Sequence, residues 1–213
     1  MNVVIKILAV IFTLFLVTAC ASPTVKEEVS AEFSAEGLHK VSFSGFDEAY
    51  VLPDANLPSY RAVNIMPLQS ANATFTSTIV SNTKRQDWQM TDEREANMAK
   101  AWAAAMDRAF STYSKDSAGE AVLKITAEIT RVIPGRSSGT TSTGAGKPAM
   151  ASADTVDIEA EFRLYEQGSD NLLAVIRDSR TISILLWTQA EGAEMGNLFN
   201  SWAGSLHHRI SGN

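Results

Sequence analysis

The sequence predicts an α+β domain in which two helices pack on one face of a mainly antiparallel sheet of about four strands. Residues 121–134 and 154–166 alternate apolar and polar side chains with period two, so one face of a sheet meets a core and the other meets water. Residues 91–113 and 193–210 repeat apolar side chains every three or four positions, as one face of an α-helix does. The order strand, helix, three strands, helix places both helices on the same side of the sheet.

A first buried strand is expected at residues 60–66, a compact apolar run that a proline ends. The stretch before it, residues 41–59, is broken by glycine and prolines, so an irregular path is expected there. Residues 69–90 are polar and form a long connection, with a short extended piece expected at 73–80.

The first helix begins near Thr91 or Asp92, either of which can cap the free backbone N–H groups of its first turn. Its expected apolar stripe consists of Met98, Trp102, Ala105, Met106, Ala109, Phe110 and Tyr113. The closing helix carries a second stripe, made of Met195, Leu198, Phe199, Trp202, Leu206 and Ile210. Between the helices, the strands at 121–134 and 154–166 and a third at 172–184 complete the predicted sheet, with a turn at 167–171.

The first 19 residues have the pattern of a secretory signal peptide. Lys6 supplies a positive charge, and residues 7–17 are an apolar run interrupted only by one threonine. This run is too short to cross a membrane, which takes about 20 residues of helix. It also has no polar face, so it is not typical of a helix that packs on a domain.

Cys20 is the one cysteine of the chain, and residues 17–20 resemble a bacterial lipobox. In such proteins a signal peptidase cuts before the cysteine, and acyl chains are attached to its sulfur and its amine. Because two or more acyl chains give stable anchoring, we expect Cys20 to be lipidated and to hold the chain in a membrane. Residues 20–40 are then a polar, lipid-anchored tether, ordered in part around Phe33 or Leu38. Residues 41–213 form one domain.

The net charge is −6, and loss of Lys6 with the signal peptide changes it to −7. An acidic surface argues against binding to nucleic acid or to anionic lipid head groups, so the acyl chains alone are expected to contact the membrane. Ala21 and Ser22 follow the cysteine, with no aspartate. By resemblance to proteobacterial lipoproteins, this predicts the periplasmic face of the bacterial outer membrane.

Residues 135–139 fit G-x-S-x-G, the nucleophile elbow of serine hydrolases, with Ser137 as the nucleophile. An elbow turns directly from a strand into a helix, whereas poor helix formers without apolar periodicity follow Ser137. Lys147 follows a glycine, but the spacing of a phosphate-binding loop is absent. Neither catalysis nor nucleotide binding is therefore expected.

No metal or cofactor site is expected. His207 and His208 are adjacent on a helix and point about 100° apart, so they cannot converge on one ion. The acidic positions of the strand at 154–166 are Asp157, Glu159 and Glu161. We interpret this row as a solvated face balanced by Lys124 or Arg163, and not as acid–base machinery.

Two tryptophans, Trp88 and Trp187, lie in or near connections rather than on a core stripe, and tryptophan is enriched at interfaces. The loop at 135–153 is long, and loops of that length are either disordered or functional. The candidate partner surface is therefore Trp88, Trp187, Arg136 and Lys147.

Several of these segments occur in a characteristic order: the lipobox, "SYRAVNIMPLQ", the alanine-rich helix, "AVLKITAEITRVIP", a Gly-rich insert, "SADTVDIEAEFRLYEQGSDNLLAVIRDSR" and "LFNSWAGSLHHRI". In this order they resemble a family of bacterial lipoproteins catalogued as domain of unknown function 3313. The resemblance covers most of the mature chain. It departs in the insert, which is shorter and more polar than is usual, and in "QGSDNL", which replaces an Asp-x-x-Thr-Gly-Glu turn. Its motifs are packing patterns, so the resemblance implies the fold but no activity and no site residues.

We therefore expect a non-enzymatic binding or assembly accessory of the cell envelope, whose partner is another envelope protein. A carrier of a small ligand or a lipid is the alternative, with its pocket between the sheet and the helices. A carrier would leave the apolar helix stripes partly uncovered, whereas a docking module would pack them completely.

Overall fold

Three long antiparallel strands form the centre of the fold: β6 (Val122–Arg136), β7 (Asp154–Glu166) and β8 (Asn171–Ser183). The computed structural model describes residues 24–42, 44–76, 90–115, 121–136, 154–183 and 193–212. The predicted core-facing positions are buried: Leu123, Ile125, Ala127, Ile129, Val156, Ile158, Ala160, Phe162 and Leu164. The alternation of the sequence therefore identifies the core face of β6 and β7 correctly.

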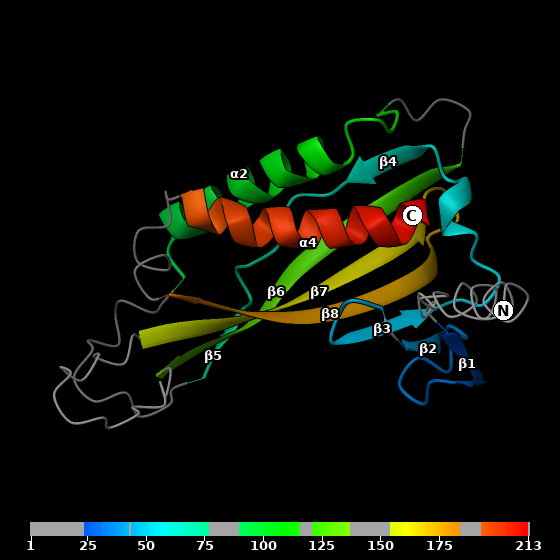
Figure 1. The fold of residues 1–213 in the computed structure, drawn as a ribbon, viewed down its shortest axis with the longest axis horizontal. Helices are drawn as coiled ribbons and strands as arrows, with labels where there is room; N and C mark the ends of the chain where they lie inside the picture. The colour runs from blue at the N-terminus through cyan, green and yellow to red at the C-terminus, as the bar shows by residue number, and fades with distance from the viewer. Residues whose placement is uncertain are drawn as a thin grey trace, which may run out of the picture.

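The two helices, α2 (Asp92–Ala109) and α4 (Ala193–Ser211), lie side by side on one face of this sheet (Figure 1). Thr91 caps α2, because its Oγ1 accepts a hydrogen bond of 3.2 Å from the backbone N–H of Arg94. The residues of the two stripes that are at most 1% exposed are Met98, Trp102, Ala105, Met106, Phe110, Met195, Phe199, Trp202, Leu206 and Ile210.

Aromatic side chains fill the middle of the layer between helices and sheet. Trp102 of α2 stacks on Phe162 of β7 with ring centroids 5.8 Å apart, and Trp202 of α4 meets the same ring at 5.5 Å. The indole N–H of Trp102 donates to the backbone carbonyl of Met66 at 3.3 Å, so this buried polar group has a partner. The interior between the two layers is thus closely packed.

Shorter strands extend the sheet on both sides. They are β1 (Thr24–Val29), β2 (His39–Ser42), β3 (Glu48–Val51), β4 (Ala62–Ile65) and β5 (Thr74–Phe75), and a 3₁₀ turn, η1 (Leu57–Ser59), precedes β4. The strand order is β1-β2-β3-β8-β7-β6-β4, with β5 also paired to β6.

The predicted sheet of about four mainly antiparallel strands is wrong, although the α+β class and the two helices are right. The sheet has eight strands and is mixed, because β4 and β5 run parallel to β6. Strands β1, β2, β3 and β5 are two to six residues long and lie in polar or glycine- and proline-broken segments. Such short strands have no strong sequence pattern, since their pairing depends on distant partners.

The structure also differs from the predicted tether at residues 20–40. From Thr24 onward this segment is part of the sheet, as β1, a turn and the start of β2. Phe33 and Leu38 in and after the turn are buried against Tyr50 and Val175, on a second, smaller core. The turn therefore covers part of the sheet face opposite the helices.

Candidate functional site

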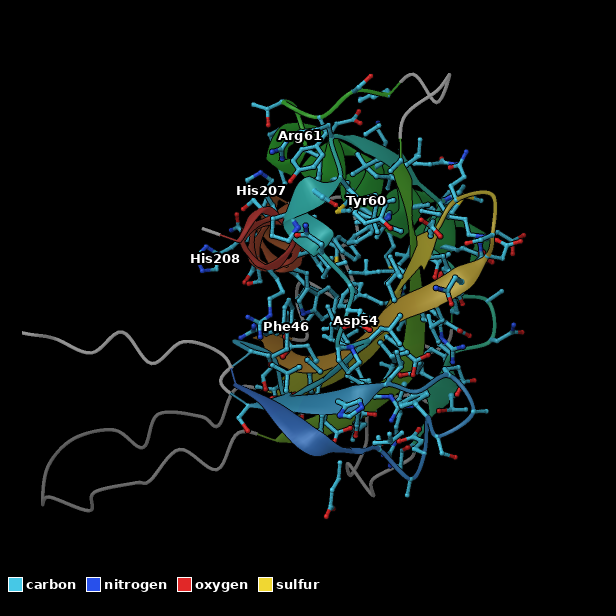
Figure 2. The ribbon with its side chains drawn as sticks, turned by 90° about the vertical axis from the view of Figure 1, so that its right-hand side faces the viewer. Phe46, Asp54, Tyr60, Arg61, His207 and His208 are labelled. Atoms are coloured by element: carbon cyan, nitrogen blue, oxygen red, sulfur yellow. The ribbon has the colours of Figure 1, made fainter. Side chains whose placement is uncertain are left out.

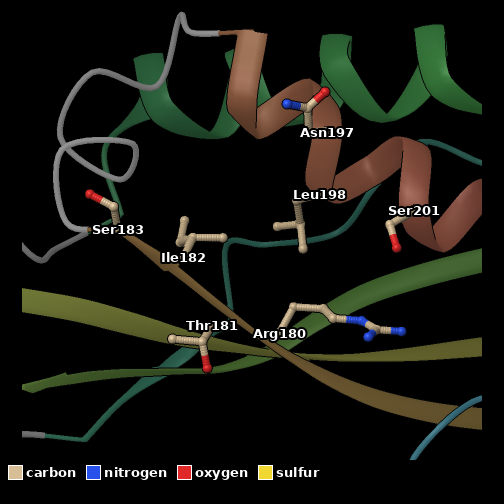
Figure 3. Close-up of a pocket in the computed structure, with 7 residues that line it drawn as sticks. All are labelled: Arg180, Thr181, Ile182, Ser183, Asn197, Leu198 and Ser201. Atoms are coloured by element: carbon tan, nitrogen blue, oxygen red, sulfur yellow. The ribbon is translucent and has the colours of Figure 1, made fainter. Parts of the chain in front are cut away.

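An open groove of about 340 Å³ lies between the end of β8 and α4 (Figure 3). Residues 180–183 of β8 line one side of the groove, and Asn197, Leu198 and Ser201 of α4 line the other. Figure 3 shows Ile182 and Leu198 between strand and helix, with the guanidinium of Arg180 lying toward the Ser201 side. The groove combines an apolar wall with one cation and several hydrogen-bonding groups.

Asp178, two residues before Arg180, is buried beneath α4 and only 4% exposed. The indole N–H of Trp202 donates to its Oδ2 at 2.8 Å, and the backbone N–H of Asp47 donates to its Oδ1 at 3.1 Å. Asp47 in turn accepts a hydrogen bond of 2.8 Å from the backbone N–H of Ser179. Asp178 therefore joins β8, α4 and the segment before β3, which are far apart in the sequence.

Arg180 completes this arrangement at the surface. Its Nε lies 2.7 Å from Asp178 Oδ2, as an ion pair and not as a hydrogen bond. The Arg180 side chain is 39% exposed, and no described residue pairs with its Nη atoms. The site can thus bind an anionic or polar group.

A second polar cluster lies on the opposite face of the sheet, around Arg177. Its Nε contacts Glu161 Oε2 at 2.7 Å, and its Nη atoms contact Glu32 at 2.6 and 3.1 Å and Glu48 at 3.7 Å. Glu161 also accepts a hydrogen bond of 2.7 Å from Arg163. Because Glu32 belongs to the turn after β1, this cluster fastens the N-terminal turn to β8.

Charge and burial act against each other at Glu161. Burial raises the pKa of its carboxyl, but hydrogen bonds and charges from Arg177 and Arg163 outweigh burial, so the net pKa is lowered. The pKa of Arg177 is raised, chiefly by its hydrogen bond to Glu32. Glu161 and Arg177 are therefore both ionised at neutral pH.

Most of the site residues predicted from the sequence lie outside the described residues: Cys20, Trp88, Trp187 and Lys147. Arg136 is the last residue of β6, and its side chain is likewise outside the description. The described part of the chain therefore brings none of these candidates together.

Ser137 also lies outside the described residues. The two histidines of α4 diverge, as helix geometry predicts (Figure 2). His207 packs edge-on against the rings of Phe110 at 5.3 Å and Tyr113 at 5.8 Å, whereas His208 is exposed. His207 is thus a packing residue at the contact between α2 and α4.

Sequence reasoning missed both polar clusters. It interpreted Glu161 as part of a solvated row, whereas Glu161 is 9% exposed, and only its pairing with Arg163 was anticipated. A usable signal was present in β8, where Arg177, Asp178 and Arg180 follow the apolar run 172–176 and place charges on both faces of one strand. Charges inside a buried strand require partners, and that requirement predicts clusters of this kind.

Within the described ranges, no group of three or more His, Cys, Asp or Glu side chains is placed to hold a metal ion. Among the helices of the same ranges, none is long and apolar enough to cross a membrane.

No family model matches the sequence, and no curated protein does so. Several solved structures are similar in fold. A PelC variant, a dodecamer from Paraburkholderia phytofirmans, has a TM-score of 0.36 and 7% identity, with 72% of this chain and 93% of that chain covered. The hypothetical protein CT253 from Chlamydia trachomatis has a TM-score of 0.34 and 7% identity, with coverage of 72% and 99%. Protein XCC0632 from Xanthomonas campestris, of family DUF330, has a TM-score of 0.32 and 12% identity, with coverage of 73% and 94%. At these values the likeness concerns the fold alone.

Proposed function

We propose that the protein is a lipid-anchored accessory of the cell envelope that binds another envelope protein and catalyses no reaction itself. The packing of the helices on the sheet is the observation that supports this proposal. Trp102, Phe199 and Trp202 are 0% exposed, so the layer in which a carrier would hold its ligand is filled by side chains. The groove lies instead at the surface, beside α4. This arrangement favours contact with a partner over storage of a small molecule.

The lipobox at residues 17–20 supports anchoring through Cys20, and we place the anchor at the periplasmic face of the outer membrane. Only three residues separate Cys20 from Thr24, where β1 begins. Since an extended chain spans at most ~3.6 Å per residue, the proposed anchor would hold Thr24 within roughly 14 Å of its lipidated cysteine. The β1 side of the sheet would then face the membrane, and the partner would approach from elsewhere.

Two measurements test the proposal. Cells are labelled with palmitate, and we expect label in the wild-type protein but not in the Cys20→Ser variant. A photoreactive residue is then introduced singly at three exposed positions: Ser201 beside the groove, Lys100 on α2 and Glu128 on the opposite sheet face. A cross-link to one defined envelope protein from at least one position, lost with Cys20→Ser, is the expected result. Absence of the palmitate label contradicts the anchor, and lipid adducts in place of a protein would support the carrier.

A further inference from the structure

Strand β8 extends well past its neighbour β3 (Figure 1). The pairing of β3 with β8 ends at Glu48 and Arg177, whereas the pairing of β7 with β8 continues to Ser183. Among the described residues, no strand pairs with β8 on the β3 side beyond Arg177. The last part of β8 is therefore an edge of the sheet.

The backbone N–H and C=O of Thr181 point outward at this edge, away from β7. Ser179 donates its N–H to Asp47 Oδ2 at 2.8 Å, so the backbone groups of Ser179 point away from β7. Alternate residues of a strand direct these groups to the same side, and the register of β7 with β8 has no bulge between Thr155 and Leu164. The N–H and C=O of Thr181 consequently also point away from β7, and such an edge can pair with another strand.

The groove lies directly beside this edge. Thr181 lines it from the strand, and Ile182 and Leu198 provide an apolar wall for side chains that turn toward the helix (Figure 3). A strand added to β8 would lie where β3 would continue. Every second side chain of that strand would then enter the groove.

Charge complementarity indicates what such a strand carries. Arg180 is the charged residue among those that line the groove, and its Nε side already faces Asp178. Its exposed Nη atoms can form a bidentate pair with a carboxylate, whereas a lysine there would meet a like charge.

We propose that the edge of β8 binds an extended peptide segment of the partner by strand addition, with an acidic side chain of that segment opposite Arg180. The inference rests on the proposed function, since it names the contact through which the accessory binds. Backbone hydrogen bonds supply affinity in this mode, and side-chain pockets supply selectivity.

The probes are three fluorescein-labelled nine-residue peptides of alternating valine and threonine. One has a central aspartate, one has a central lysine, and one has the aspartate with N-methyl groups on alternate amides. Fluorescence anisotropy is measured with the full-length protein in detergent. We expect the aspartate peptide to bind, and both other peptides to bind at least tenfold more weakly.

Three variants locate the contact. Thr181→Pro removes the N–H at the edge without removing a hydrogen bond to β7. A strand tolerates proline at such an edge position, and we expect at least tenfold weaker binding of the aspartate peptide. Thr181→Val is the matched control, because it keeps the N–H and loses only the hydroxyl that bonds Asp157. Arg180→Gln is expected to abolish the preference for aspartate over lysine, and it provides a second test if Thr181→Pro fails to fold.

Unchanged affinity in Thr181→Pro, or no anisotropy change with any peptide, overturns the inference. A concentration-dependent dimer that Thr181→Pro dissociates also overturns it, since a second copy of the chain would then occupy the edge. These outcomes leave the palmitate label and the in-cell cross-links of the proposed function intact. Loss of that label and of those cross-links counts against the proposed function, whether or not the peptides bind.

Discussion

Asp178 and Glu161 are two buried carboxylates on adjoining strands, and they lie on opposite faces of one sheet. Asp178 faces α4 and is bound by two neutral N–H donors together with the ion pair to Arg180. Glu161 faces the side without helices and is bound by Arg177 and Arg163, whose side chains remain 33% and 42% exposed.

The two carboxylates differ in whether their hydrogen-bond donors would find another partner if the carboxylate were removed. Beneath α4 the indole N–H of Trp202 would have no other partner, and an unsatisfied buried donor costs about 1–3 kcal/mol. On the other face water can reach the exposed sides of Arg163 and Arg177. A buried carboxylate thus fixes packing on the helix face, whereas on the other face it organises a cluster that tolerates its loss better.

The largest effect is expected for Asp178→Ala. This variant leaves the indole of Trp202 and the Arg180 charge without their partner, so we expect a loss of about 3 kcal/mol in the free energy of unfolding. Urea denaturation of wild type and variant measures it. Asp157→Ala, on the same sheet but partly exposed, is the matched control and is expected to lose less than about 1 kcal/mol. A loss below that of the control would contradict the role assigned to Asp178.

Removal of Phe33 tests whether the second core can open separately from the central sheet. Phe33 is 7% exposed, and its ring lies 4.9 Å from that of Tyr50 and 5.5 Å from the guanidinium carbon of Arg177. We expect Phe33→Ala to cost about 2 kcal/mol, below the usual range for a central core, because the cluster is small. Hydrogen exchange should accelerate in β1 and β2 while β7 keeps its protection. Equal acceleration in β7 would show that the second core does not open separately.

A smaller loss, about 1–2 kcal/mol at pH 7, is expected for Glu161→Gln, since water screens its partly exposed partners. The loss depends on pH because the pKa of Glu161 is lowered in the folded state. Its contribution is fully present above the ordinary carboxyl value of 4.5 and disappears as the pH falls through the folded pKa. The difference in unfolding free energy between wild type and variant should therefore narrow from pH 5 to pH 2. A difference that stays constant over this range would exclude ionic stabilisation by Glu161.

The smallest effect is expected for Glu159→Gln. Glu159 lies two residues from Glu161 on the same face, but its side chain is 36% exposed and its contact with Arg131 is 3.6 Å long. Such a pair contributes less than about 0.5 kcal/mol. Denaturation of this variant and of Glu161→Gln, at low and at high salt, measures the loss in unfolding free energy for each. A loss as large as that of Glu161→Gln would show that burial does not distinguish the two glutamates.

Sequence patterns predicted the elements that are long enough to show a periodicity of their own. The period-two alternation identified β6 and β7, and the apolar stripes identified α2 and α4, because burial on one face dictates those patterns directly. The parallel pairing of β4 with β6 was missed, since it is made across an intervening helix. The strands before residue 52 were missed because they obtain their burial from β8, more than a hundred residues later.

The candidate groove was harder to predict from the sequence than the fold. Arg180 and Thr181 belong to a strand that the sequence predicts, but the exposure of their edge depends on where β3 stops. That end point follows from the hydrogen bonds of Asp47 to Ser179 and Asp178, which no local pattern encodes.

The topology also sets an order of assembly. Helix α2 and the hairpins of β6, β7 and β8 form from neighbouring segments. Strand β3 can pair with β2 early, but it has no partner in the central sheet until β8 exists, and β1 and β2 join that sheet only through β3. A chain made from its N-terminus must therefore keep its first three strands unpaired to the central sheet until residue 177 has emerged. Closing loops of this length is slow, so we expect strands β1 to β3, which follow the proposed anchor, to be the last to join the central sheet.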